Sequence, residues 1–327
     1  MRRIVFGLTA ALVVIFLTAA GLELTSRFVV DDGMQYDLEM WKYALRLKKV
    51  SDDPLIGHVH VPGRQARLMG ADFKINSKGL RDREFSYDRV PGKRRILMLG
   101  DSFTVGWGVA LDDTFSKRIE KMYTAAGADT EVLDAGVGNY NTVQEVQYFL
   151  TEGYKYRPDV VVLNYFVNDA EPVTADAPPG FLMRVCYACV VIAGRVDTVM
   201  RQFFGKPDWS EYYLGLYGGG ASKGWRDARE AIHKLADFCR KNGIVLLVAS
   251  IPDLHDVQSY RLQSITDLVG QAARQDGAGF VDLLPYLKEQ PSSKLWVTDA
   301  DPHPNALAHS VIAKGIFDAM QKLRASP

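Results

Sequence analysis

The residue with the clearest capacity for chemistry is Ser102, in a Gly-Asp-Ser-Phe run at positions 100–103. This run directly follows an apolar stretch at 96–99 that predicts a buried strand. Open α/β sheets bind ligands at the carboxyl ends of their strands, so a serine placed here is well sited for a nucleophile. The run does not match the G-x-S-x-G elbow, because the next glycine, Gly106, lies too far along the chain. It is not a phosphate-binding loop either, because no Gly-Lys-Ser/Thr follows it.

Three further polar runs follow in order, each beside a predicted strand end or helix start. They occupy 134–142 (Asp-Ala-Gly-Val-Gly-Asn-Tyr-Asn-Thr), 166–169 (Phe-Val-Asn-Asp) and 301–305 (Asp-Pro-His-Pro-Asn). Serine is a poor nucleophile at neutral pH and needs a base, which His303 would supply to Ser102. Asp301 would orient that imidazole and stabilise its protonated form. The residue types therefore predict nucleophilic acyl transfer.

A tetrahedral oxyanion, the charge that develops in such a reaction, needs preorganised hydrogen-bond donors. We expect them to be the backbone N–H of Ser102, a backbone N–H in the turn of Gly138 and Asn139, and the side-chain amide of Asn168. Losing one donor of this kind typically costs roughly 3 kcal/mol of transition-state stabilisation.

The four runs in this order resemble the SGNH/GDSL hydrolase family, over about residues 92–322. The resemblance implies a three-layer α/β/α sandwich around a mostly parallel, five-stranded sheet of flavodoxin-like type. The family usually has glycine at the second oxyanion position, where this chain has Asn139. Many members place the triad aspartate three residues before the histidine, whereas Asp301 lies two before and Asp299 four before. We favour Asp301, because the Asp-x-His spacing also occurs in relatives that handle acetyl groups on polysaccharides.

The reaction class follows from the residues, and its substrate class from the resemblance. A serine, a base and an oxyanion hole act on an ester through an acyl-enzyme and require neither metal nor nucleotide, so no cofactor is expected. We predict a carbohydrate acetyl-esterase, with an esterified carbohydrate or small ester as substrate. An O-acetyltransferase for an envelope or secreted polysaccharide, an enzyme acting on acyl chains, and a non-catalytic glycan-binding domain remain alternatives.

Further substrate contacts are expected close to these runs. Tyr140 and Asp169 lie within them, and His255 follows a predicted strand at 243–249. A long insertion at about 171–224 would form a lid or a binding element. Its aromatic part, which contains Tyr212, Tyr213 and Tyr217, would offer a surface for stacking on sugars.

Alternating strand and helix patterns must position these residues, as in a parallel sheet covered on both faces. Besides the strand at 95–99, we expect strands at 131–133, 160–163, 243–249 and 280–282. Helices are expected at 114–125, from 142, at 225–240, at 267–275 and from about 305.

The amino terminus is a different kind of segment. Two arginines precede a run of nearly twenty residues without a charge, which ends at Leu22 and is about the length that crosses a membrane. The arginines predict a cytoplasmic amino terminus and an exported remainder. We therefore expect a transmembrane signal anchor at 1–24, an extension at 25–91 and a catalytic domain at 92–327. The expected location is the bacterial inner membrane, with a periplasmic catalytic domain; secretion after signal cleavage is the alternative.

The remaining features restrict function less. Lysine plus arginine and aspartate plus glutamate both number 39, which argues against a nucleic-acid partner. Cys186 and Cys189 form a C-x-x-C compatible with a disulfide, a redox pair or half a metal site, but their apolar surroundings favour free cysteines packed as small hydrophobes. His58 and His60 alternate as on a strand and are expected at the surface, not on a metal.

Overall fold

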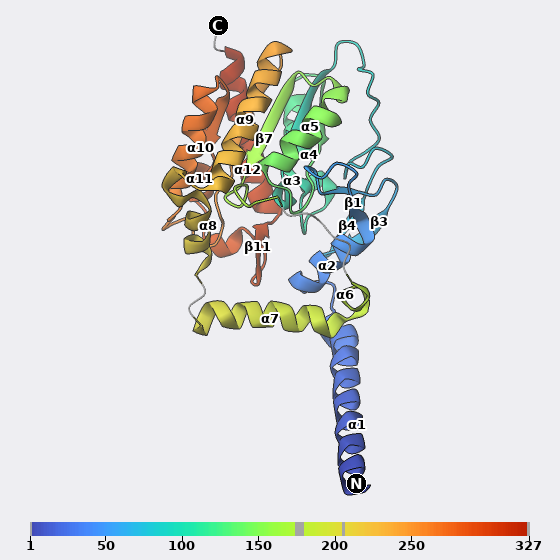
Figure 1. Ribbon diagram of the computed structural model, residues 1–327. Helices are drawn as coiled ribbons and strands as arrows, with labels where there is room; N and C mark the ends of the chain where they lie inside the picture. Colours follow the sequence, from blue (N-terminus) through green and yellow to red (C-terminus); the bar gives the residue numbers. More distant parts are fainter. Residues whose placement is uncertain (1, 174–179, 205–206, 326–327) are drawn as a thin grey trace.

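The computed structural model describes residues 2–173, 180–204 and 207–325 of the 327-residue chain. At its centre lies a parallel sheet of five strands in the order β6-β5-β7-β8-β9 (Figure 1). Its strands are apolar almost throughout and largely buried, as expected for a parallel sheet covered on both faces. They are β5 (Arg94–Leu99), β6 (Thr130–Asp134), β7 (Val160–Tyr165), β8 (Val245–Ser250) and β9 (Gly279–Asp282).

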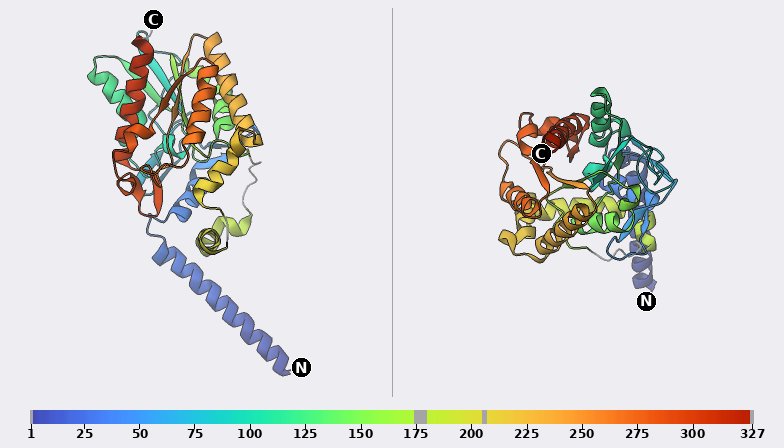
Figure 2. Two further views of the ribbon diagram at one scale, coloured as in Figure 1. Left: turned by 90° about the vertical axis from the view of Figure 1, so that its left-hand side faces the viewer. Right: turned by 90° about the horizontal axis from the view of Figure 1, so that it is seen from above.

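Helices cover both faces of this sheet. On one face α4 (Phe115–Ala125) packs beside α12 (Ala306–Ala325). The other face carries α5 (Thr142–Thr151), α9 (Lys223–Lys241) and α10 (Gln263–Gln275) (Figures 1 and 2). The three-layer α/β/α fold and its five-stranded parallel sheet are thus confirmed, with element ends within a few residues of those expected.

Short elements connect this framework. They are α3 (Ser102–Val105), η2 (Leu111–Asp113), η3 (Gly153–Tyr156), α11 (Leu284–Leu287), η5 (Ser292–Lys294), and the hairpin of β10 (Trp296–Thr298) and β11 (Asp301–Pro304).

The amino-terminal helix projects from the body of the protein. Helix α1 (Arg2–Thr25) continues into one π-helical segment, η1 (Ser26–Val30) (Figures 1 and 2). Its most apolar 18-residue window has a mean hydropathy of 2.4 and buries no residue. By length and composition, α1 with η1 is the one helix in the described residues that could cross a membrane.

The extension between this helix and the sheet forms small elements beside the catalytic runs. They are α2 (Tyr36–Leu47) and two antiparallel pairs, β1 (Lys48–Val50) with β2 (His58–His60) and β3 (Gln65–Leu68) with β4 (Ala71–Lys74). A small apolar core joins the extension to the segment after Ser102, because Tyr43 and Phe73 pack on Trp107. Buried Arg81 strengthens this junction by donating to the carbonyl oxygens of Asp72, Val105, Gly106 and Val109.

The insertion contains α6 (Phe181–Val185), α7 (Tyr187–Phe203), α8 (Trp209–Tyr217) and η4 (Gly218–Gly220). Cys186 and Cys189 form a disulfide, so the expectation of free, packed cysteines is wrong. Cys186 is the N-cap of α7 and Cys189 lies in its first turn, which brings their Cα atoms to 5.3 Å, a usual separation for a disulfide. The third cysteine, Cys239, is free and buried.

Candidate active site

Ser102 lies beyond the carboxyl end of β5, an interior strand of the sheet, where the chain turns into α3. The turn requires Gly100, since a Cβ there would lie 1.9 Å from the hydroxyl oxygen of Thr104. Asp101 caps α3 by accepting a hydrogen bond from the backbone N–H of Phe103 at 2.9 Å. These contacts leave the Ser102 hydroxyl free to meet the β10–β11 hairpin.

The hairpin brings His303 and Asp301 to the serine. The Oγ of Ser102 lies 2.9 Å from Nε2 of His303, and Nδ1 of His303 lies 2.6 Å from Oδ1 of Asp301. Of the two aspartates considered, Asp301 is fully buried and holds the imidazole, whereas Asp299 is exposed. The three side chains therefore form a hydrogen-bonded chain, although about 200 residues separate Ser102 from the other two.

The environment of Asp301 favours its ionised form. Burial pushes the pKa of Asp301 upward, but the hydrogen bonds and charge of His303 outweigh it and hold that pKa below its ordinary value. Trp107 contributes to this effect, because its indole N–H donates to Oδ2 of Asp301 at 3.0 Å. An ionised carboxylate is the form that stabilises a protonated imidazole.

Two aromatic residues at this site were not expected from the sequence. Trp107 contacts the aspartate, and Tyr36, the first residue of α2, packs its ring 5.7 Å from that of His303. Trp107 follows Ser102 closely in the sequence, and this closeness was the one feature that could have indicated its place at the site. For Tyr36 the sequence carried none, because it lies 66 positions before the serine, in a segment without catalytic motifs.

The candidate oxyanion donors need one correction. The backbone N–H of Gly138 donates to the hydroxyl of Tyr43 at 2.9 Å, so it is not available to an oxyanion, and the prediction for Gly138 is wrong. By contrast, the N–H groups of Ser102 and Asn139 donate to no partner within the described part of the chain. Asn139 has φ of +67°, a conformation that asparagine tolerates better than most residues.

Asn168 lies in the turn that follows β7. Its side-chain amide interacts with the Asp101 carboxylate and partly opposes the rise in the Asp101 pKa that burial causes. An amide nitrogen carries two hydrogens, so one such interaction leaves a second donor. The side-chain oxygen of Asn168 is buried without a partner among the described residues.

Side chains from the extension hold the Gly138–Asn139 turn in place. Lys48 donates to the carbonyl oxygen of Gly138 and to Oδ1 of Asn139, at 3.2 and 3.1 Å. His58 Nε2 lies 3.0 Å from the same carbonyl oxygen. His58 and His60 are both buried, so their expected surface location is wrong; burial lowers the pKa of His60 to about 3 and keeps it neutral.

Each of the three expected substrate contacts has a hydrogen-bond partner within the protein. Tyr140 is buried and donates its hydroxyl hydrogen to the carbonyl oxygen of His58 at 2.6 Å. Asp169 is buried and accepts from the Phe166 N–H and the Thr142 hydroxyl. Tyr140 also lines the hollow described below, so its contact with substrate stays a prediction. Asp169 keeps one carboxylate oxygen without a partner among the described residues, and its contact with substrate stays a prediction too. His255 pairs with Asp253 at 2.7 Å beside Trp296, with no contact to Ser102 among the described residues.

A polar hollow of about 300 Å³ lies beside the candidate oxyanion donors. Asn139 and Asn168 line it together with Glu171 and Tyr212. Of the three insertion tyrosines, Tyr212 alone lines this hollow. The other two, Tyr213 and Tyr217, are buried, so the expected aromatic surface for sugar stacking reduces to one side chain.

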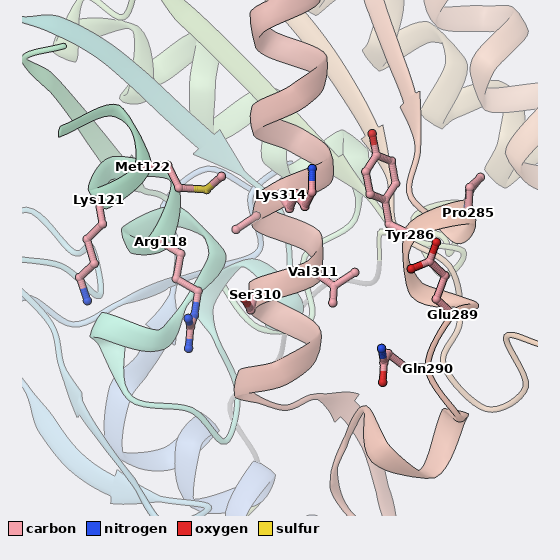
Figure 3. A pocket seen from close by; sticks show the side chains of 11 residues that line it. Arg118, Lys121, Met122, Pro285, Tyr286, Glu289, Gln290, Ser310, Val311 and Lys314 are labelled. Carbon is pink, nitrogen blue, oxygen red and sulfur yellow. The ribbon is translucent and has the colours of Figure 1, made fainter. Parts of the chain in front are cut away.

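A second hollow, of about 730 Å³, lies between α4, α11 and α12 (Figure 3). None of the candidate catalytic residues lines it. Two of its basic side chains already have acidic partners, since Arg118 pairs with Asp113 and Lys314 with Asp318. We assign no function to this hollow.

Three buried carboxyl groups, those of Asp101, Glu145 and Asp169, interact with one another near the serine. Burial raises the pKa of Asp101 to about 6, against the opposing hydrogen bond from Phe103 and the charge of His303. Burial, together with the charges of Asp169 and Asp101, raises the pKa of Glu145 well above its ordinary value. Both carboxylate oxygens of Glu145 lack a partner within the described residues, which fits a protonated acid.

The fold and the Ser102–His303–Asp301 arrangement together define a serine-hydrolase type of architecture. A family model for the GDSL-like lipase/acylhydrolase family matches residues 98–311. The chain belongs to this family. Its members are ester hydrolases of the serine type, and the resemblance stated from the sequence is confirmed. A comparison with curated proteins gives no match.

The chain is also similar to solved structures of esterases. TesA shares 13% identity at a TM-score of 0.47, covering 70% of this chain and 99% of TesA. The psychrotrophic esterase EstA from a Pseudoalteromonas species shares 13% identity at a TM-score of 0.46, and the match covers 71% of this chain and 98% of EstA. Axe2, an acetylxylan esterase from Geobacillus stearothermophilus, shares 12% identity at a TM-score of 0.47, and the match covers 69% of this chain and 94% of Axe2.

Proposed function

We propose that this protein is a membrane-anchored serine esterase that removes acyl groups, most simply acetyl groups, from an esterified carbohydrate. The observation that carries the proposal is the chain of hydrogen bonds from Ser102 through His303 to Asp301. It supplies a nucleophile, a base and an orienting carboxylate, which are the groups that acyl transfer requires.

The proposed reaction proceeds in two halves. Ser102 Oγ attacks the ester carbonyl carbon while its proton passes to Nε2 of His303, and Asp301 stabilises the imidazolium. The N–H groups of Ser102 and Asn139 and the Asn168 amide receive the negative oxygen. His303 returns the proton to the departing alcohol, leaving an acyl-enzyme. Water, deprotonated by His303, then attacks the carbonyl carbon of this ester. His303 returns the proton to Ser102 Oγ as the Oγ–acyl bond breaks, which releases the carboxylic acid and free Ser102.

The polar hollow beside Asn139 and Asn168 supports a carbohydrate substrate. Amide, carboxyl and phenol groups line it, and such groups hydrogen-bond to sugar hydroxyls. Tyr212 adds an aromatic ring at the edge of the hollow. A long acyl chain would need an apolar channel instead, so this lining favours a short acyl group on a polar carrier.

Helix α1 and the Cys186–Cys189 disulfide support an extracytoplasmic location. The helix is long and apolar enough to span a bilayer, and disulfides persist mainly in oxidising compartments. In this proposal residues 1–24 anchor the protein, 25–91 form a supporting extension, and 92–327 form a periplasmic catalytic domain.

The proposal is tested with full-length protein in detergent, using p-nitrophenyl acetate as substrate. Ser102→Ala should lower p-nitrophenol release by on the order of 10³-fold or more, because the proposed acyl-enzyme forms on the Ser102 hydroxyl. Release equal in the two proteins would overturn the proposal. Oligosaccharide acceptors added to the same assay separate hydrolysis from transfer, since an O-acetyltransferase would yield acetylated oligosaccharide instead of free acetate.

A further inference from the structure

Helix α7 carries a stripe of exposed apolar side chains along one side. Residues three or four positions apart lie on the same face of a helix. An exposed apolar patch of this kind marks a surface that contacts a partner or a membrane. The stripe consists of Ile192, Val196, Val199, Met200 and Phe203, whose exposed fractions range from 41% to 68%.

The opposite side of α7 packs against the body of the protein. A Cβ at Gly194 would lie 2.3 Å from a carboxylate oxygen of Asp37 in α2, so the two helices meet at this glycine. Gly194 and Phe203 are nine residues apart, which is two and a half helical turns and therefore opposite faces. The apolar stripe thus faces away from α2 and from the catalytic residues.

The start of α7 is fastened to the end of α1. The Glu23 carboxylate accepts hydrogen bonds from the backbone N–H groups of Tyr187 and Ala188, at 3.1 and 2.9 Å. These N–H groups belong to the first turn of α7 and have no partner within the helix. Arg27 pairs with Glu23 at 2.6 Å, places its guanidinium 4.4 Å from the centre of the Tyr187 ring, and donates to the carbonyl oxygen of Val185.

The direction of α7 relative to α1 indicates what covers the stripe. Helix α7 runs across the end of α1, with the catalytic body on the side away from the amino terminus (Figures 1 and 2). A helix that crosses the end of a membrane span lies along the bilayer surface. Apolar side chains are exposed at the end of α1 as well, where Phe28 and Val29 are 78% and 74% exposed.

We propose that α6 and α7 lie in the interfacial layer of the same bilayer that α1 crosses, as a second, in-plane membrane contact. The inference rests on the proposed membrane anchoring by α1. Phe181 and Leu182 of α6, 81% and 62% exposed, extend the apolar contact. The exposed Arg195 beside the stripe reaches the lipid phosphates, as arginines flanking interfacial helices do.

This placement fixes the position of the candidate active site. The Tyr36 ring lies 5.7 Å from that of His303, and the next residue, Asp37, contacts Gly194 of α7. A single short helix, α2, therefore connects the catalytic histidine to the membrane-lying helix. The site is held close to the membrane surface, on the side of the body that faces the bilayer.

The test uses full-length protein reconstituted into vesicles of phosphatidylcholine and phosphatidylglycerol. Val196→Cys places a thiol in the stripe, and Lys234→Cys places a matched control on the exposed surface of α9. Both are labelled with nitrobenzoxadiazole, and the unsubstituted chain gives the background, because Cys239 is buried and the other two cysteines are disulfide-bonded. Fluorescence is then measured with and without doxyl-labelled lipid.

We expect doxyl lipid to quench the Val196 label by about twofold or more, with a blue-shifted emission, and to leave the Lys234 label unchanged. Protein that floats with the vesicles while its Val196 label remains in water would overturn the placement of α7 but not the anchor. Protein that does not float would overturn both. A disulfide between two copies of the unlabelled Val196→Cys variant, formed with an added oxidant such as copper phenanthroline, together with no lipid quenching of the label, would place a second chain on the stripe and reject the proposal. Ester hydrolysis measured on the same vesicles reports separately on the proposed function.

Discussion

At the scale of single residues, the choice between Asp301 and Asp299 depends on contact geometry. Asp301 holds Nδ1 of His303 and is buried, while Asp299 is exposed two positions earlier. Both spacings were compatible with the sequence, because a loop residue can reach a neighbouring histidine from several positions. The β10–β11 hairpin turns only one of the two carboxylates toward the imidazole.

Replacing Asp301 by asparagine should therefore reduce kcat/KM for p-nitrophenyl acetate by on the order of 10³-fold, because the neutral amide neither orients nor stabilises the imidazolium. The matched variant Asp299→Asn removes the same charge from the exposed position and should leave kcat/KM within about twofold of wild type. Equal losses in both variants, measured by steady-state kinetics, would contradict the assignment.

Trp107 acts on catalysis through the aspartate, as a positioning residue. Trp107→Phe keeps the aromatic packing but removes the N–H that donates to Oδ2 of Asp301. Since hydrogen bonds to charged groups are worth about 1.5–3 kcal/mol, we expect kcat to fall roughly 10-fold or more, with KM little changed. The pH profile should move as well, because the pKa of Asp301 rises when a donor is lost. Unchanged kcat and pH profile in a folded variant would refute this role.

At the scale of elements, the turn between β6 and α5 shows that an asparagine can adopt the backbone conformation for which the family usually has a glycine. Asn139 occupies the place where the family usually has glycine, and its φ of +67° is the conformation that glycine adopts freely. Lys48 from β1 and Tyr43 from α2 hold this turn through Gly138 and Asn139. The extension is therefore part of the structure that positions the candidate oxyanion donor.

This geometry distinguishes two substitutions at one position. Asn139→Gly should keep the backbone N–H in place and retain kcat within a few-fold, whereas Asn139→Ala should lower the free energy of unfolding by about 1 kcal/mol and kcat with it, because alanine resists the left-handed conformation. Urea unfolding and steady-state kinetics measure the two effects. If the glycine variant loses as much activity as the alanine variant, then the asparagine side chain itself is required.

At the scale of the whole molecule, the buried carboxyl groups set the pH dependence of stability. The folded protein raises the pKa of Asp101 to about 6, of Asp134 to about 7, and of Glu145 well above its ordinary value, chiefly by burial. The folded state then holds protons that the unfolded chain releases near pH 4. Unfolding releases protons in this range, so these groups make stability fall as pH rises from about 4 to 7.

Glu145→Gln should remove one such contribution. Because glutamine does not titrate, the variant should gain stability relative to wild type by on the order of 1 kcal/mol for each pH unit above about 4.5. Urea denaturation at pH 5, 6 and 7 measures this difference. A difference between variant and wild type that does not change with pH would show that Glu145 is ionised in the folded protein. Ser116→Ala, which removes a hydrogen bond to Asp134 but no charge from the Glu145 cluster, is a useful comparison.

Much of this protein is determined by local sequence. The apolar runs before Ser102 and Asn168 each form a buried strand, because period and composition decide strand formation locally. The uncharged run after the amino-terminal arginines forms α1 for the same reason. The pairing of Ser102 with His303 was predictable as well, because the chemistry of serine requires a base and the carboxyl ends of parallel strands converge.

Only the tertiary structure decides how distant segments compete for the same polar groups. The Tyr43 hydroxyl accepts a hydrogen bond from the Gly138 N–H, and the His58 carbonyl oxygen accepts one from the Tyr140 hydroxyl. Tyr36 packs on His303. Tyr36, Tyr43 and His58 all belong to an extension that carries no catalytic motif. Such contacts depend on side chains that pack from far along the chain, and spacing within one segment does not encode them. The position of α7 is decided in the same way, because its two faces differ only once α2 covers one of them.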